Sequence, residues 1–201
     1  PPRRPVQLTP AEKQALAAYA YGLIDQMLGK EAALPKPPAI DVRYRRVYVT
    51  LYVEGRVRGC EAGHTGKDLA ADVRTAVMKS VESERFGGAL AREELNGLTL
   101  GFSLLYNRDV LKEYDEDTVR RGVELGVHAL GIRRGTKTAI FKETVPVKKS
   151  YSLKRTLERL CLKAGLARDA YALSGTWLYR FRSFSFLGQR DGQITDLVRG
   201  N

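Results

Sequence analysis

Strict alternation over residues 47–53 is the feature that most constrains the fold. Aliphatic side chains alternate there with aromatic or β-branched ones, in the order Val47, Tyr48, Val49, Thr50, Leu51, Tyr52, Val53. A two-residue period in such residues predicts a strand with one side turned toward a core. The segment Glu54-Gly55-Arg56 predicts a turn into a second short strand that ends at Gly59-Cys60.

Three other segments have helical spacing. Thr9 as N-cap, Pro10 at the first position and Glu12 at the third predict a helix that begins there and ends at Gly29. Apolar residues at three- and four-residue spacing predict further helices over residues 67–83 and 150–164. The segment Pro35-Lys36-Pro37-Pro38 predicts a linker, because it cannot continue a helix.

Alternation returns later in the chain. Residues 98–104 predict a strand, residues 123–145 a small antiparallel set separated by glycines, and residues 177–186 a final aromatic-rich strand. Helices and antiparallel strands are therefore mixed rather than strictly alternating. This order predicts an α+β fold with mixed or antiparallel sheets and flanking helices, and not a doubly wound one.

Composition sets the broad class. The chain has 201 residues, of which 43% are hydrophobic and 28% charged, as in an ordinary globular protein. No apolar run approaches the roughly 20 residues of a membrane span, so no membrane partner is expected. Two cysteines do not form a disulfide framework, and we expect cytoplasmic surroundings, with Cys161 as a core thiol. We interpret the chain as an excerpt of a longer polypeptide.

The net charge of +11 suggests nucleic acid as one possible partner. Basic pairs occur at Arg45-Arg46, Arg120-Arg121, Arg133-Arg134 and Lys148-Lys149. They could form a phosphate-tracking face if they converge. Residues 51–100, however, carry 7 basic and 8 acidic side chains, so the excess is spread over the rest of the chain. A solvated basic surface is the favoured interpretation, and nucleic-acid binding stays an alternative.

Reactive side chains are concentrated in residues 57–67, which we interpret as a loop between a strand and a helix. The segment reads Val57-Arg58-Gly59-Cys60-Glu61-Ala62-Gly63-His64-Thr65-Gly66-Lys67. Its glycines permit left-handed backbone and the close approach of another group. A nucleophilic thiol at Cys60 requires a nearby cation or helix N-terminus, and Arg58, His64 and Lys67 are the candidate cations.

Other interpretations of this loop stay open. It could bind a phosphate or carboxylate through its amides and the following helix N-terminus. Cys60 could instead be a buried small hydrophobe, and His64 an exposed loop histidine. No nucleotide-binding motif is present, so no cofactor is expected. Glu61 or His128 could join Cys60 and His64 around a metal, but no paired spacing supports one, and no metal is expected.

Taken together, these segments resemble the AMMECR-one domain family. The family has a strand ending in Leu-Arg-Gly-Cys-Ile-Gly, and Val57-Arg58-Gly59-Cys60 occupies that place. Further matches are Val81 to Phe86, Glu93-Glu94-Leu95 before the strand from Leu98 to Leu105, Gly126 to Ile132, Lys163 to Leu166 and Tyr179-Arg180-Phe181. This chain has Glu61-Ala62-Gly63 where the family has Ile-Gly, so it resembles a divergent member.

The resemblance implies an α+β domain with two lobes in one compact unit over residues 9–187. Residues 1–8 would then be a tail, and residues 188–201 an extension leading to a possible further domain. It also implies association with Memo-type proteins and radical S-adenosylmethionine enzymes. No established reaction comes with it.

Three functions follow as hypotheses. In the first, Cys60 is a catalytic nucleophile, His64 or His128 is its base, Glu61 orients the histidine, and Arg58 stabilises an oxyanion. In the second, the chain is a non-catalytic module for an anionic small molecule or a protein partner, whose ligand-binding candidates are Gly59, Glu61, Gly63, Lys67 and His128. The third is nucleic-acid binding through basic and aromatic residues.

Overall fold

The structure is a computed structural model that describes residues 7–30, 33, 35–65, 68–111 and 116–197. Its helices are α1 (Pro10–Met27), α2 (Leu69–Val81), α3 (Glu116–Gly122), α4 (Thr144–Lys148) and α5 (Leu153–Lys163). Its strands are β1 (Arg46–Val53), β2 (Arg56–Gly63), β3 (Leu98–Leu111), β4 (His128–Arg134), β5 (Lys137–Phe141), β6 (Thr176–Gly188) and β7 (Ile194–Asp196). Short 3-10 helices cover Glu84–Phe86, Arg92–Gly97 and Ala170–Ala172.

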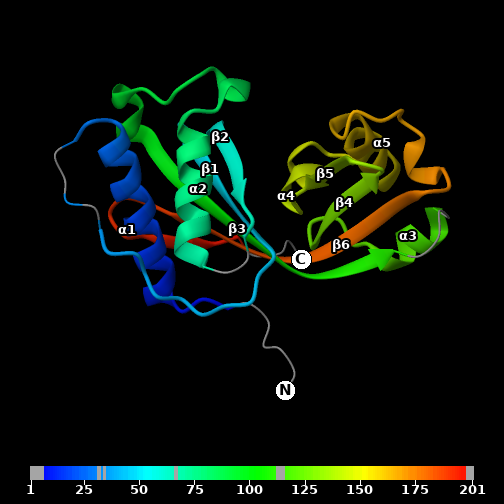
Figure 1. The fold of residues 1–201 in the computed structure, drawn as a ribbon, viewed down its shortest axis with the longest axis horizontal. Helices are drawn as coiled ribbons and strands as arrows, with labels where there is room; N and C mark the ends of the chain where they lie inside the picture. Colours follow the sequence, from blue (N-terminus) through cyan, green and yellow to red (C-terminus); the bar gives the residue numbers. More distant parts are fainter. Residues whose placement is uncertain (1–6, 31–32, 34, 66–67, 112–115, 198–201) are drawn as a thin grey trace. The chain divides into compact units, whose positions relative to one another are not determined.

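The strands follow the order β2-β1-β3-β6-β4-β5, with β7 beside β6. The chain divides into two compact units, which we call unit 1 (residues 1–104 and 184–198) and unit 2 (residues 105–183 and 199–201). Strands β3 and β6 each contribute to both units. In unit 1, α1 and α2 lie side by side over the strands, and in unit 2, α4 and α5 lie beside β4 and β5 (Figure 1). The predicted α+β class is confirmed.

The core of unit 1 lies between its two long helices and one face of its strands. The aliphatic residues of β1 that alternate in the sequence, Val47, Val49 and Leu51, are each 0% exposed. Phe102 of β3 stacks on Phe186 of β6 with 4.8 Å between ring centroids. The strand predicted over residues 47–53 is therefore confirmed, and its aliphatic side chains face the core.

Segments near both ends of the described chain pack together in unit 1. The predicted capping box at the start of α1 is present, since Thr9 and Glu12 each accept from the other's backbone N–H. Nζ of Lys13 in α1 donates to Asp196 of β7 at 2.7 Å. Strand β7 thus packs in unit 1, and so does Leu8, which is 5% exposed. The domain limits expected at residues 9 and 187 stay a prediction.

Unit 2 has its own core beneath α5. Strand β4 pairs antiparallel with both β5 and β6, and its core residues Leu130 and Ile132 are buried beside Leu157 and Cys161 of α5. The prediction of Cys161 as a core thiol is confirmed, and burial raises its pKa.

Part of the predicted antiparallel set in unit 2 is wrong. Residues 123–127 form a turn in which the N–H groups of Val127 and His128 donate to the Glu124 carbonyl. Gly126 has a φ of 87° there, which an extended strand does not contain. Residues 144–148 form α4 instead of the end of a strand, because Pro146 lies in a first helical turn, where its missing N–H costs nothing. In the described residues, no helix is both long and apolar enough to cross a membrane.

Candidate functional site

The segment predicted as a reactive loop is largely a strand. β2 continues to Gly63 and pairs with β1 along its length, with Cys60 opposite Thr50 and Ala62 opposite Tyr48. Neither Gly59 nor Gly63 has a positive φ, so the expectation that these glycines supply left-handed backbone is wrong. Lys67 lies outside the described residues, and its predicted role stays a prediction.

The glycines of β2 allow close packing with α2. A Cβ atom on Gly59 would collide with the carbonyl oxygen of Ser80, and one on Gly63 would collide with the carbonyl oxygen of Asp72. Gly59 and Gly63 lie on the same side of β2. The second part of the prediction, that another group approaches these glycines closely, is therefore confirmed, and that group is the backbone of α2.

Two polar side chains of α2 hold this junction. The Ser80 hydroxyl donates to the Val49 carbonyl at 3.0 Å and accepts from the Glu61 N–H at 2.9 Å. Buried Asp72 accepts from the Tyr44 hydroxyl at 2.5 Å. Burial and this hydrogen bond raise the pKa of Tyr44. The Ser80 hydroxyl thus bridges β1 and β2, since Val49 and Glu61 are paired residues of these strands.

Arg58 acts as a clamp on a neighbouring turn. Its Nε donates to Glu94 at 2.7 Å, and its terminal nitrogens donate to the carbonyl oxygens of Phe86, Gly88 and Ala89 at 2.8–3.0 Å. Four of the five N–H groups of the guanidinium thus have acceptors. Burial by itself would raise the pKa of Glu94, but the Ala91 N–H and Arg58 bring it below the usual value.

Cys60 lies half-buried in the middle of β2, on the side opposite Gly59 and Gly63. The Thr50 hydroxyl donates to its Sγ at 3.3 Å. His64 is exposed and four residues further on, so an extended chain separates the two Cα atoms by about 13 Å. That spacing exceeds the reach of a direct hydrogen bond, and the structure does not pair Cys60 with His64.

The two other predicted site residues have separate surroundings. The Glu61 carboxylate accepts from Ser83 at 3.3 Å and lies 3.5 Å from Arg85, on the side of β2 opposite Cys60. His128 belongs to unit 2, where its Nδ1 accepts from the Glu124 N–H at 3.1 Å. Burial, together with the charge of Arg180, lowers the pKa of His128. A histidine in this setting stays neutral at pH 7.

Cys60 shares its side of the unit 1 sheet with small and hydroxyl-bearing residues. We call this surface the Cys60 face, and it comprises Cys60, Ala62, Tyr48, Thr50, Tyr52, Gly101, Ser103 and Ser185. The Ser185 hydroxyl donates to Ser103 at 2.9 Å, and the Tyr52 ring lies over Gly101. Thr50, Ser103 and Ser185 are all buried.

Sequence reasoning missed these hydroxyl residues, although a signal was present. In β3, Gly101 and Ser103 alternate with the aliphatic and aromatic residues of the core. In β6, Ser185 lies between two phenylalanines. The small and hydroxyl-bearing residues between the core positions are thus the signal in the sequence for this face.

No metal centre is apparent in the described part of the chain, since no three His, Cys, Asp or Glu side chains gather there. A cavity of about 280 Å³ lies elsewhere in unit 1, between α1 and residues 189–192. Arg190 makes a bidentate pair with Asp25 beside it and stacks over Tyr21. Because these charges already satisfy one another, we place the candidate site on the Cys60 face.

Comparison with known proteins identifies a matching family, related sequences and a solved structure of the same fold. The AMMECR1 family model matches residues 17–186. A protein of Aquifex aeolicus is 30% identical over 172 residues, which are 80% of this chain and 84% of that protein. One of Methanocaldococcus jannaschii is 26% identical over 184 residues, 89% of this chain and 91% of the relative. The crystal structure of a Pyrococcus horikoshii protein has the same fold, with a TM-score of 0.75, 24% identity and coverage of 92% and 93% of the two chains.

Proposed function

The chain belongs to the AMMECR1 family, as its sequence motifs predicted, and we propose that it works as a binding domain whose ligand surface is the Cys60 face. One observation carries this proposal. The same strands present an aliphatic and aromatic face to the helices of unit 1, whereas their other side combines hydroxyls, a thiol and glycine with tyrosine rings and Leu187.

That contrast has a physical meaning. A buried hydroxyl needs a hydrogen-bond partner, which a valine in the same place would not. Here Thr50 donates to Cys60 and Ser185 donates to Ser103, so polar groups are kept and satisfied on this face. Thr50, Ser103 and Ser185 are buried on one face, and Thr50 lies directly opposite Cys60. Ligand sites combine aromatic walls with a few placed polar groups, and Tyr48 and Tyr52 supply the rings here.

A self-contained cysteine nucleophile has less support. Such a thiol requires a cation or base beside it. Arg58 is committed to Glu94 and the carbonyls of a turn, and His64 lies too far along the strand. The polar neighbour of Cys60 is the neutral hydroxyl of Thr50. Cys60 thus supports ligand contact better than covalent chemistry.

The ligand chemistry follows from the lining groups. Hydroxyls, a thiol and tyrosine rings recognise a neutral group that has a flat face and a hydrogen-bonding edge, such as an amide or a small ring. Residues 1–104 and 184–198 carry 16 basic and 14 acidic side chains, so unit 1 has little excess charge for attracting an anion. Both cysteines are free thiols, which suits the cytoplasmic surroundings in which we propose that the domain acts. Association with Memo-type and radical S-adenosylmethionine proteins stays a prediction.

Methyl NMR tests the binding proposal. With phenol and N-methylacetamide as ring and amide probes, the methyl group of Thr50 should show saturable shift changes. The exposed Thr138 methyl of unit 2 serves as an internal control and should not respond. Cys60→Leu should abolish the response by filling the face, whereas Val57→Leu, on an exposed position of the same strand, should preserve it. Equal responses at Thr50 and Thr138 would reject the proposal.

A further inference from the structure

The positive charge of the protein is concentrated in unit 2. Residues 105–183 carry 17 Lys and Arg against 9 Asp and Glu, whereas unit 1 is nearly balanced. Charge of this density on one compact unit attracts polyanions at long range. It does not by itself define where a polyanion would bind.

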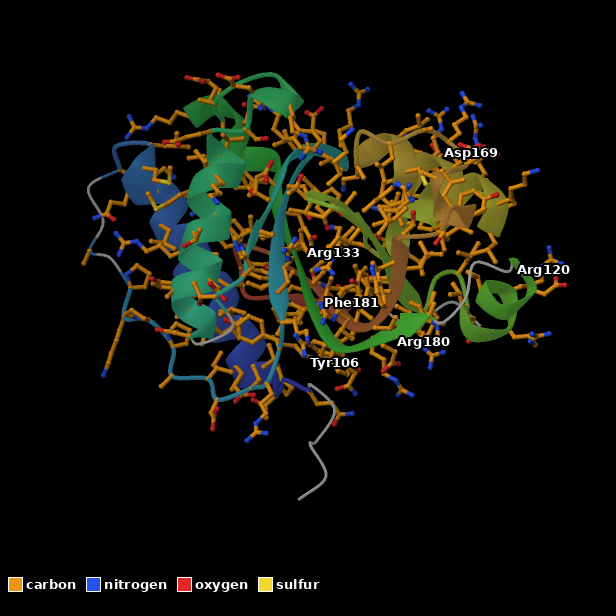
Figure 2. All side chains as sticks on the ribbon, turned by 45° about the vertical axis from the view of Figure 1, so that its right-hand side comes forward. Tyr106, Arg120, Arg133, Asp169, Arg180 and Phe181 are labelled. Carbon is orange, nitrogen blue, oxygen red and sulfur yellow. The ribbon has the colours of Figure 1, made fainter. Side chains whose placement is uncertain are left out.

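One face of the unit 2 sheet carries aromatic and arginine side chains together. Trp177, Tyr179 and Phe181 alternate along β6 on the side away from Leu178, which belongs to the core. In the register with β4, Trp177 lies opposite Arg133, and Tyr179 lies opposite Gly131. Arg133 and Phe181 are labelled in Figure 2. We call this surface the Trp177 face.

The Trp177 face has a glycine in β4 that leaves room for the aromatic rings of β6. A Cβ atom on Gly131 would lie 3.0 Å from the Phe181 ring, so the glycine lets that ring cover β4. The guanidinium of Arg108, from β3, lies 4.9 Å from the centre of the Tyr179 ring. Tyr179 and Phe181 are thereby packed into the sheet and form a firm base for the exposed end of the face.

Trp177 forms that exposed end. Its side chain is 48% exposed, and the neighbouring Arg133 is exposed as well. A half-exposed indole contributes less to the stability of the fold than a fully buried one would. A tryptophan beside arginines is typical of surfaces that bind a partner.

We propose that the Trp177 face binds single-stranded nucleic acid, with a base stacked on the Trp177 indole and the phosphates paired with Arg133 and Arg108. Stacking needs a base with an open face, which a single strand offers and a duplex does not. The guanidinium groups suit phosphate because their planar donors can contact two oxygens at once. This inference concerns unit 2 and is independent of the Cys60 face.

The protein contains its own reporter, since Trp177 is the single tryptophan of the chain. Its fluorescence should be quenched on titration with an oligothymidylate of about 12 nucleotides at low salt. Affinity should fall steeply between about 50 and 200 mM salt. No quenching at low salt would overturn the proposal. A polyglutamate or a duplex of matched charge that quenches equally well would also overturn it, because neither can stack on the indole.

Paired variants distinguish binding at the Trp177 face from binding through the general positive charge of unit 2. Arg133→Gln should weaken binding about tenfold, whereas Arg168→Gln, at an exposed arginine in the loop after α5, should change it less than about twofold. Trp177→Ala should weaken binding of a fluorescently labelled oligothymidylate, while Leu173→Ala, at another exposed apolar residue of unit 2, should not. Equal losses within either pair would overturn the assignment of this face.

Discussion

Gly59 of β2 lies directly against the carbonyl oxygen of Ser80 in α2, with no space for a side chain between them. The backbone contact brings the strand that carries Cys60 close to its supporting helix. Arg58 and Gly59, two residues of the segment that resembles the family motif, therefore have structural roles, one as a clamp and the other as a packing contact.

Gly59→Ala should destabilise the fold, because the added methyl group must displace the backbone of α2. Overpacking of this kind costs about 1–3 kcal/mol, or more where backbone has to move. Urea denaturation measures the loss. Gly97→Ala is the matched control, since its Cβ would meet its nearest atom at an ordinary 3.5 Å. If Gly59→Ala unfolds at the same urea concentration as Gly97→Ala, the close contact is not real.

Arg58→Lys should free the turn at residues 86–89 although the charge is kept, because a lysine cannot reproduce the planar fork of donors. The expected loss of stability is about 1–3 kcal/mol. Hydrogen exchange at residues 86–91 should quicken more than exchange in β5. Arg56→Lys, at an exposed position of the same strand, should leave both rates unchanged. Unchanged exchange at residues 86–91 in Arg58→Lys would contradict the clamp.

His128 should titrate below its ordinary value of 6.5, because burial and Arg180 lower its pKa. The unfolded chain therefore binds a proton at His128 more readily than the folded protein does. The free energy of unfolding consequently falls as the pH drops below about 6.5. Proton NMR follows the two imidazoles separately, with His64→Gln assigning them. A midpoint for His128 above 6.5 would contradict the burial described here.

Alkali should destabilise the protein partly through Tyr21. Burial raises its pKa to about 12 from 10.0, and its hydroxyl donates to the Leu98 and Gly188 carbonyls. The unfolded chain releases this proton first, so stability falls as the pH rises from about 10 to 12, by about 1.4 kcal/mol per pH unit. Tyr21→Phe should be less stable at pH 7 but show a shallower fall. Parallel stability curves would show that Tyr21 ionises equally in both states.

Much of the fold was predictable from local patterns. The capping box at Thr9 and the alternation in β1 depend on local backbone preferences, and the structure keeps both. The turn at residues 123–127 resembles a strand in the sequence, because Val123, Leu125 and Val127 alternate with other residues. Gly126 was the contrary signal, since it takes a positive φ there.

The site was harder to predict, since its chemistry depends on contacts between distant segments. Glycines in residues 57–67 were compatible with a reactive loop or with close helix packing, and only the position of Ser80 and Asp72 distinguishes the two. The acceptors of Arg58 lie at residues 86–94, with no local pattern to reveal them. The alignment of Cys60 with Thr50 depends on strand register, which a single sequence does not specify.

The rate at which Cys60 is alkylated tests the central claim most directly. Iodoacetamide at pH 7, followed by peptide mass spectrometry, separates Cys60 from buried Cys161, and glutathione serves as the reference thiol. A binding surface with no activating cation or base beside Cys60 among the described residues predicts that Cys60 reacts no faster than glutathione. Modification about tenfold faster than glutathione would contradict the account and identify Cys60 as an activated nucleophile.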